Sequence, residues 1–123
     1  MDENRTEVSL SIDMKKSRLR IHKTTLNQLG NVGYIQLLVN PTDKILAVRG
    51  SETRHKDSHS LARVQLNPDN CFELYSKLLV AKIMSLLPEL DEECTYRIPG
   101  EAHTGDNIAF FPLRSMQKVE VTE

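Results

Sequence analysis

His55 and His59 stand four residues apart in the segment RHKDSH (54–59). On a helix, two imidazoles at this spacing share one face and can bind a metal ion together. The segment is polar, however, and its apolar residues show no periodicity, which is typical of an exposed loop. We therefore expect a loop over residues 50–60 and predict no metal site.

Carboxylates and an imidazole occur close together in GEAHTGD (100–106), which contains Glu101, His103 and Asp106. Such groups can transfer protons if a pocket encloses them. Residues 104–107 have the composition of a hairpin loop, however, and no nucleophile, second carboxylate or Gly-rich phosphate loop elsewhere has a matching spacing. We predict that the protein is not an enzyme and uses no cofactor.

Basic side chains gather in two places, although the formal net charge is −1. KKSRLRIHK (15–23) contains Lys and Arg without any acid, and residues 49–63 form a second, mixed cluster. Such clusters can bind an anion, either duplex phosphate or a nucleotide, or they can protect a solvated edge strand from aggregation. The residues that we predict to form the anion site are Arg18, Arg20, His22, Lys23, Arg49, Arg54 and Lys56.

The 123 residues are enough for one domain with a single core, so we expect residues 1–123 to fold as one unit, with residues 1–14 as a candidate mobile N-terminal segment. Hydrophobic residues make up 39% and charged residues 27%, which is typical of a soluble protein. The start is acidic and polar, no apolar run could span a membrane, and Cys71 and Cys94 lack a zinc-ligand spacing. These features predict a cytoplasmic protein without a membrane partner.

The segment YIQLLVNPTDKILAVRG (34–50) predicts two strands joined by a turn. Its NPTD sequence is typical of a type I turn, which would place Val39 opposite Lys44. The face of this hairpin that points away from the core also carries apolar residues, Leu38 and Ile45, so we expect this face to pack against a second sheet or a partner chain. The face that we assign to the core carries Ile35, Leu37, Val39, Leu46 and Val48.

The residues before this hairpin predict a strand and a short helix. LRIHK alternates apolar and basic residues, which indicates a half-exposed strand. A helix of two turns follows, with Thr24 or Thr25 as its N-cap and Gly30 as its stop signal.

The second half of the chain predicts a strand at 61–66 and then the longest helix. Asn67, Pro68 and Asp69 form a strong helix start, and the wide apolar band after them predicts one long buried helix over residues 68–87. Two further strands fall within 93–102 and 107–114. Residues 116–121 form a last strand or a tail.

The order of strand, helix and hairpin thus occurs twice. We predict an α+β fold, a small and mostly antiparallel β-barrel or sandwich built from two strand–helix–hairpin units. The long helix would be buried under the sheet or in a subunit interface.

Residues 19–50 resemble the AbrB/MazE-like swapped-hairpin proteins, whose unit is a strand, a short helix ending in Leu-Gly, and a hairpin closing in basic residues. The resemblance implies a small β-barrel of intertwined hairpins, usually a dimer, that binds DNA through the early strand. The positions it assigns to DNA contact are Arg18, Arg20 and Lys23, with Arg49 nearby.

Two hypotheses follow. The first is a dimeric, AbrB-like transcriptional regulator whose partners are a second copy of the chain, or a higher oligomer of it, and duplex DNA. The second is a small sequestering or inhibitory protein that binds a nucleotide-like anion or a larger enzyme without catalysis. The near-neutral total charge and the polar 50–60 loop favour the second.

Overall fold

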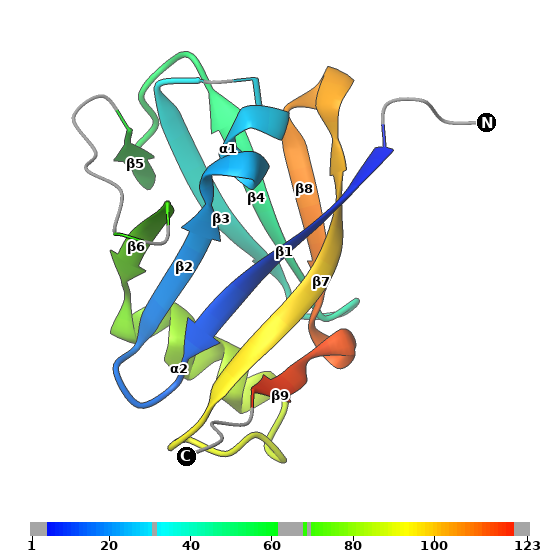
Figure 1. Ribbon diagram of the computed structural model, residues 1–123. Helices are drawn as coiled ribbons and strands as arrows, with labels where there is room; N and C mark the ends of the chain where they lie inside the picture. The colour runs from blue at the N-terminus through cyan, green and yellow to red at the C-terminus, as the bar shows by residue number, and fades with distance from the viewer. Residues whose placement is uncertain (1–4, 31, 62–67, 69, 120–123) are drawn as a thin grey trace.

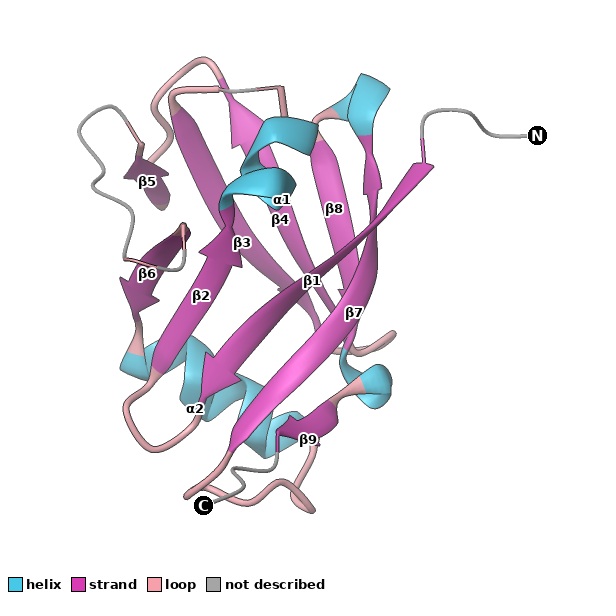
Figure 2. Cartoon of the chain, viewed as in Figure 1, coloured by secondary structure: helices cyan, strands magenta, loops and turns pink. Residues whose placement is uncertain are grey.

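The structure, a computed structural model, describes residues 5–30, 32–61, 68 and 70–119. In this part of the chain one antiparallel sheet curls into a half-barrel (Figures 1 and 2). Its strands are β1 (Arg5–Asp13), β2 (Arg18–His22), β3 (Tyr34–Asn40), β4 (Ile45–Ser51), β5 (Ser58–Ser60), β6 (Cys71–Tyr75), β7 (Thr95–His103), β8 (Ile108–Pro112) and β9 (Gln117–Val119). The helices are α1 (Lys23–Gln28) and α2 (Lys77–Leu86), with short 3₁₀ turns η1 (Thr104–Asp106) and η2 (Leu113–Ser115).

The strand order is β5-β3-β4-β8-β7-β1-β2-β6, and β9 adds to β7. The α+β class and the mostly antiparallel sheet are therefore confirmed, with the sheet curled as a half-barrel. Alternate side chains fill its inside, because a strand points successive residues to opposite faces. On the central strands these inward residues are fully or almost fully buried: Leu10 and Ile12 on β1, Leu19 and Ile21 on β2, and Ile98 on β7.

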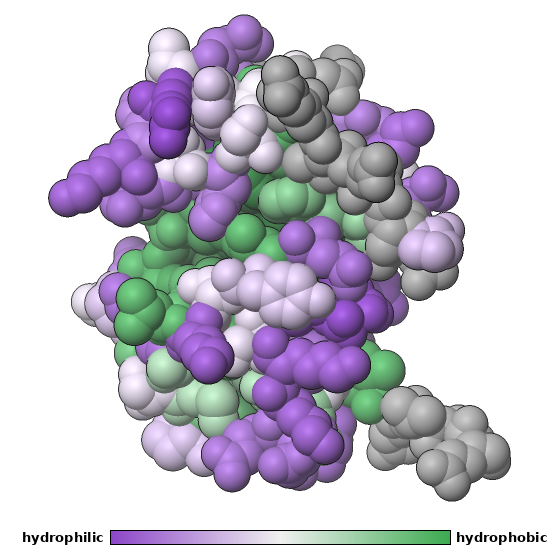
Figure 3. Space-filling view, turned by 90° about the vertical axis from the view of Figure 1, so that its left-hand side faces the viewer, coloured by the Kyte–Doolittle hydropathy of each residue, from purple (hydrophilic) through white to green (hydrophobic). Residues whose placement is uncertain are grey.

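The two ends of the strand order, β5 and β6, lie on the same side of the molecule. Seen from that side, hydrophobic side chains are visible in a hollow between hydrophilic regions (Figure 3). Helix α2 lies across one end of the half-barrel (Figure 1). None of the helices in the described ranges combines the length and the apolar character that a membrane span requires.

The prediction of one long helix over residues 68–87 is wrong. Pro68 lies in a turn, Cys71–Tyr75 forms β6, and α2 begins only at Lys77. Phe72 and Leu74 point inward from β6, so this segment fits a strand as well as it fits a helical stripe. The backbone pairing with β2 decides for the strand.

Helix α2 starts where Ser76 caps it, because the Ser76 side chain accepts a hydrogen bond from the backbone N–H of Leu79 at 3.2 Å. Burial of the helix is one-sided. Val80 and Ile83 are buried against the core, whereas Leu78 is 87% exposed. The predicted cap at Asn67 and the predicted strand at 61–66 fall outside the described residues, apart from Leu61.

The chain start is also different from the expectation of a mobile segment over residues 1–14. Arg5–Asp13 forms β1, which pairs with β2 on one side and with β7 on the other. Leu10, Ile12 and Met14 are buried in the core. Residues 1–4 lie outside the described part of the chain.

The predicted hairpin is confirmed as β3 and β4, with a different register. Asn40, rather than Val39, is the last paired residue before the turn, and it lies opposite Ile45. Each residue pairs with a partner two positions further along than predicted. Because successive side chains alternate between the faces, this even shift leaves each side chain on the face predicted for it. In the described residues no second sheet covers the outer face, where Leu38 is 40% exposed beside Ala47.

The loop predicted over residues 50–60 is confirmed only in its middle, between two strands. Gly50 and Ser51 continue β4, residues 52–57 are exposed, and Ser58–Ser60 pairs with β3 as β5. The predicted strands around residues 103–106 are confirmed as β7 and β8, and β9 lies within the segment 116–121.

Candidate ligand-binding site

The basic strand of the sequence analysis is β2, and its alternation sends the charges outward. Leu19 and Ile21 are buried in the half-barrel, whereas Arg18, Arg20 and His22 occupy the opposite face. Strand β2 lies between β1 and β6, so acids on both neighbouring strands can reach its arginines.

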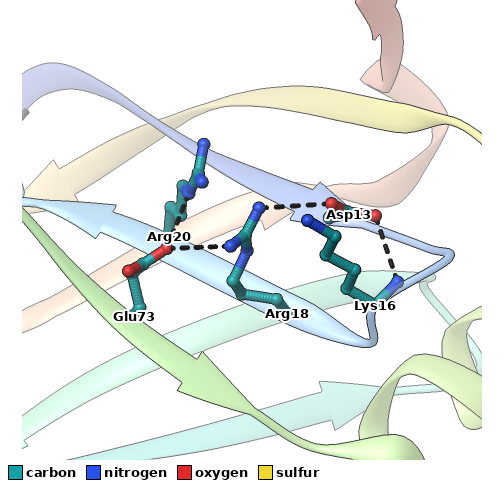
Figure 4. A network of polar contacts seen from close by, with 5 residues as sticks. All are labelled: Asp13, Lys16, Arg18, Arg20 and Glu73. Carbon is teal, nitrogen blue, oxygen red and sulfur yellow. Dashed lines mark hydrogen bonds and ion pairs between the residues drawn. The ribbon is translucent and has the colours of Figure 1, made fainter. Parts of the chain in front are cut away.

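Arg18 lies in a network of ion pairs with these acids (Figure 4). Its terminal nitrogens lie 3.3 Å from Asp13 Oδ2 on β1 and 3.3 Å from Glu73 Oε2 on β6. Asp13 also accepts a hydrogen bond from the backbone N–H of Lys16 at 3.1 Å. The Arg18 side chain is only 14% exposed. Its charge is therefore neutralised inside the fold and is not available to a partner.

The pKa of Arg18 reflects the same surroundings. Burial by itself lowers this pKa, but the Tyr75 hydroxyl and the carboxylates on either side outweigh the burial and raise the pKa above its ordinary value. The guanidinium is thus held permanently charged as part of the structure.

Arg20 differs from Arg18, because only its Nε contacts an acid. This atom donates to Glu73 Oε2 at 3.0 Å, and the end of the side chain points away from Glu73 in Figure 4. The Arg20 side chain is 39% exposed. Its two terminal nitrogens therefore remain available for a ligand.

His22 caps α1 in place of the predicted Thr24 or Thr25. Its Nδ1 accepts a hydrogen bond from the backbone N–H of Thr24 at 3.1 Å. In the neutral ring the proton is then on Nε2, which makes that atom a donor. Lys23 is the first residue of α1 and is exposed.

The remaining three predicted residues are elsewhere. Arg49 is on the outer face of β4, where it donates to Gln36 Oε1 on β3. Arg54 and Lys56 belong to the exposed 52–57 segment. The seven residues predicted from the sequence therefore do not form one site: β2 and the start of α1 bring four of them together, and the other three lie on β4 and in the loop after it.

The sheet brings to Arg20 a cation that the sequence analysis missed, Arg97 on β7. Ser11 of β1 is paired with Arg20 on one side and with Arg97 on the other, so the three side chains form one row across the outer face. Arg97 is exposed and has no ion pair within the described residues. The alternation of TYRIPG was a signal for its outward position, but its strand neighbours could not be read from the sequence.

An open groove of about 800 Å³ follows this part of the outer face. Its floor carries small side chains, Ser9 and Ser11, and α1 contributes Thr24 and Thr25. Arg20, His22 and Arg97 line one part of it; Glu7, Glu101, His103, Phe110 and Pro112 line another.

The second part of the groove is acidic. Glu7 lies directly opposite Glu101 across β1 and β7. The Glu101 carboxylate is 3.9 Å from Nη1 of Arg5 and 3.9 Å from Nε2 of His103. The His103 ring meets Phe110 edge to face with 5.3 Å between ring centroids.

The other candidate chemistries do not assemble. Asp106, in η1, makes no ion pair with His103 in the described part of the structure. His55 Nε2 lies 3.2 Å from Ser51 Oγ, whereas His59 is on β5, so the two imidazoles share no helix. No group of three potential metal ligands lies together among the described residues, and no disulfide joins Cys71 to Cys94.

The chain matches no family model, no curated protein and no solved structure.

Proposed function

We propose that the protein binds an anionic ligand, without catalysis, in the groove on the outer face of β2, β1 and β7, and that its fold is a duplicated strand–strand–helix–hairpin unit. The observation that carries the binding function is the row Arg20–Ser11–Arg97. Two arginines separated by one strand can bind the same phosphate or carboxylate from both sides, and the Ser11 hydroxyl lies between them.

The groove has the volume of a small-molecule site. Its volume of about 800 Å³ falls within the range that small ligands and cofactors occupy in proteins. The second cation of β2, Arg18, does not add to the site, because its terminal nitrogens contact Asp13 and Glu73 and its remaining nitrogen, Nε, is buried. These observations favour a compact anion over an extended one.

The positive-φ residues support the proposed duplication. Within the described residues, Ser17 (φ 52°) and Asn70 (φ 61°) directly precede β2 and β6, and Lys44 (φ 53°) and Asn107 (φ 54°) directly precede β4 and β8. This backbone conformation is uncommon in residues that have a Cβ. Its recurrence at corresponding points therefore favours a repeated chain path.

Backbone hydrogen bonds between the two halves are reciprocal in the same way. The N–H of Lys23 donates to Asn70 O at 2.8 Å, and the N–H of Ser76 donates to Ser17 O at 2.9 Å. A second exchange joins the other strand pair: Gly50 N–H donates to Asn107 O at 2.7 Å, and Leu113 N–H donates to Lys44 O at 2.8 Å. These bonds are the ones that a two-fold axis between the halves would exchange.

The strand order is consistent with two interleaved units. The pair β3–β4 is inserted between β5 and β8, and the pair β1–β2 is inserted between β7 and β6. In this scheme β1 corresponds to β5, β2 to β6, β3 to β7 and β4 to β8. The swapped-hairpin resemblance implied such a barrel from two chains; the proposed duplication provides both units in one chain and requires no second copy.

Duplex DNA binding is the second candidate function, favoured by this intertwined topology. The charges weigh against it. Glu73 is opposite Arg20 in the β2–β6 pair and occupies the corresponding position of the second unit, so the basic strand is not repeated. A regulator that reads two equivalent half-sites needs its contacts repeated across the two-fold axis, whereas a single ligand site does not.

Isothermal titration calorimetry tests the proposal with inorganic pyrophosphate and AMP as probes. We expect Arg97→Ala to weaken their binding at least tenfold, because one of the two flanking cations is lost. Arg114→Ala is the matched control, since Arg114 is an exposed arginine of η2 outside the groove. Failure of both probes to bind, or equal affinities in the two variants, overturns the proposal.

A duplex titration followed by fluorescence anisotropy tests the second candidate. DNA binding predicts an affinity that falls steeply with salt and that Arg20→Ala reduces. Absent or salt-independent binding excludes it.

A further inference from the structure

The groove has two ends of opposite charge, and this separation bears on the kind of ligand in the proposed binding function. Arg20 and Arg97 flank Ser11 at one end. Glu7 and Glu101 face each other at the other end. Ser11 and Glu7 are four positions apart on β1, which corresponds to roughly 13 Å along the strand.

Glu7 and Glu101 lie opposite each other, and of the two only Glu101 has an ion pair within the described residues. Like charges directly opposite each other on antiparallel strands destabilise the pairing. Arg5 and His103 approach only the Glu101 carboxylate, each at 3.9 Å, and Glu7 has no ion pair within the described residues. Both glutamates line the groove. This end is therefore suited to a ligand group that donates hydrogen bonds.

The surface between the two ends is mixed. Beyond Ser11, Ser9 pairs with Pro99 and His22 lines the same groove, and the Nε2–H of His22 and the hydroxyl of Ser9 suit the polar atoms of a sugar. Phe110 pairs with Glu101, and Pro112 lies beside it on β8. These two side chains provide an apolar surface next to the carboxylates, as a planar base requires.

From this arrangement we infer that the ligand is a nucleoside phosphate whose base carries an exocyclic amino group. The phosphate binds between Arg20 and Arg97. The base lies against Phe110, and its amino group donates to the carboxylates of Glu7 and Glu101. A phosphate alone would leave Glu7 without an ion-pair partner among the described residues, and a nucleic acid backbone crossing the groove would be repelled by the same two carboxylates.

The inference rests on the proposed function, and titrations with matched nucleotides separate the two. AMP is compared with the 5′-monophosphate of unsubstituted purine riboside, which differs from AMP only in lacking the amino group and so has no donor for a carboxylate on that edge of the base. We expect AMP to bind several-fold more tightly than purine riboside monophosphate, because the hydrogen bonds from the amino group to the two exposed carboxylates are lost. Ribose 5-phosphate, which lacks the base, should bind more weakly than AMP.

Two variants connect this preference to the acidic end. Glu101→Gln and Glu7→Gln keep the size of the side chain and replace one acceptor oxygen by a donor. We expect each to reduce the ratio of AMP affinity to purine riboside monophosphate affinity while leaving the affinity for inorganic pyrophosphate within a factor of two. Both glutamates are exposed, so the variants should fold, which circular dichroism will check.

The outcomes are distinct. A preference for adenine nucleotides that both variants reduce supports the inference. Equal binding of AMP and purine riboside monophosphate, with Arg97→Ala still weakening both, overturns the inference and leaves the proposed function in place. If no nucleotide and no pyrophosphate bind to the unmodified protein, the inference and the proposed function both fail.

Discussion

Strands β2 and β6 are neighbours with nearly the same backbone and different side chains. Each follows a positive-φ residue, each leads into a helix, and they pair with each other. Strand β2 has a partner on both sides, whereas the described partner of β6 is β2 alone. The outward residues of β2 are Arg18, Arg20 and His22; those of β6 are Cys71, Glu73 and Tyr75.

The difference shows that backbone pattern and charge pattern have separate roles here. Pairing with β6 places Glu73 beside both arginines of β2, and pairing with β1 places Asp13 beside Arg18. Of the two arginines, only Arg20, which lies beside Ser11, keeps terminal nitrogens without an acid partner among the described residues, because the unbonded Nε of Arg18 is buried. The capacity to bind an anion thus depends on which acids the neighbouring strands supply.

The largest expected effect is the loss of stability when a buried side chain is truncated on β2 or on β6. We expect Ile21→Ala to lower the free energy of unfolding by roughly 3–5 kcal/mol and Leu74→Ala by about 2 kcal/mol. Ile21 is 0% exposed on a strand paired on both sides, whereas Leu74 is 8% exposed on β6. Urea denaturation measures both changes. Equal losses would mean that β6 is held as firmly as β2.

The next prediction compares the loss of stability when the ion-pair network is broken with the loss when a groove residue is removed. Glu73→Ala removes the carboxylate shared by Arg18 and Arg20, and we expect a loss of about 1–2 kcal/mol in stability because Arg18 is largely buried. Arg97→Ala should change stability by less than about 0.5 kcal/mol, as is usual at an exposed site. A large loss for Arg97→Ala would show that this residue is structural and would argue against a role in binding.

The sequence predicts those elements whose signals are local. The alternation and the NPTD turn of residues 34–50 are enough for β3 and β4. The helix prediction failed for residues 71–75 because Phe72 and Leu74 fit the period of a strand, whereas Phe72 and Tyr75 also fit the period of a helix. The Asn-Pro-Asp signal before it favoured the helix. Only the pairing of β6 with β2, 53 positions earlier, resolves the ambiguity.

The candidate site could be predicted only in part. Arg20 and His22 were found because a basic strand is visible in the sequence. Arg97 was missed because its proximity to Arg20 depends on β1 lying between β2 and β7, and a single sequence does not contain that order. The neutralisation of Arg18 by Glu73 was unpredictable for the same reason, since the two residues meet only through a non-local strand pair.

A smaller effect compares the two corresponding hairpin loops. Lys44 and Asn107 have the same positive φ, but Asn tolerates this conformation better than Lys. We expect Lys44→Gly to raise the stability by about 0.5 kcal/mol, because relief of the backbone exceeds the entropy cost of Gly. Asn107→Gly should lower it, because the Asn107 amide nitrogen, suitably turned, donates to the carbonyls of Thr104 and Leu29 at 3.1 and 3.3 Å. Paired thermal denaturation curves measure the contrast.

The smallest effect concerns β5 and β1, which correspond in the proposed duplication. His59 of β5 pairs with Ile35 of β3, as Leu10 of β1 pairs with Ile98 of β7. A titratable ring thus occupies the position of a buried leucine. Burial lowers the pKa of His59, and the nearby Asp57 only partly offsets this.

The lowered pKa of His59 makes stability depend on pH in a defined direction. In the unfolded chain the pKa of His is about 6.5, so as the pH falls the unfolded chain takes up a proton before the folded chain does. The stabilising contribution is therefore complete above that pH and is lost as the pH falls toward the folded-state pKa. We expect His59→Leu to flatten the decline in melting temperature between about pH 7.5 and 5.5, whereas His55→Leu, at an exposed loop position, should leave it unchanged. An unchanged decline in His59→Leu would show that β5 does not bury this ring, and would remove His59 from the comparison with Leu10.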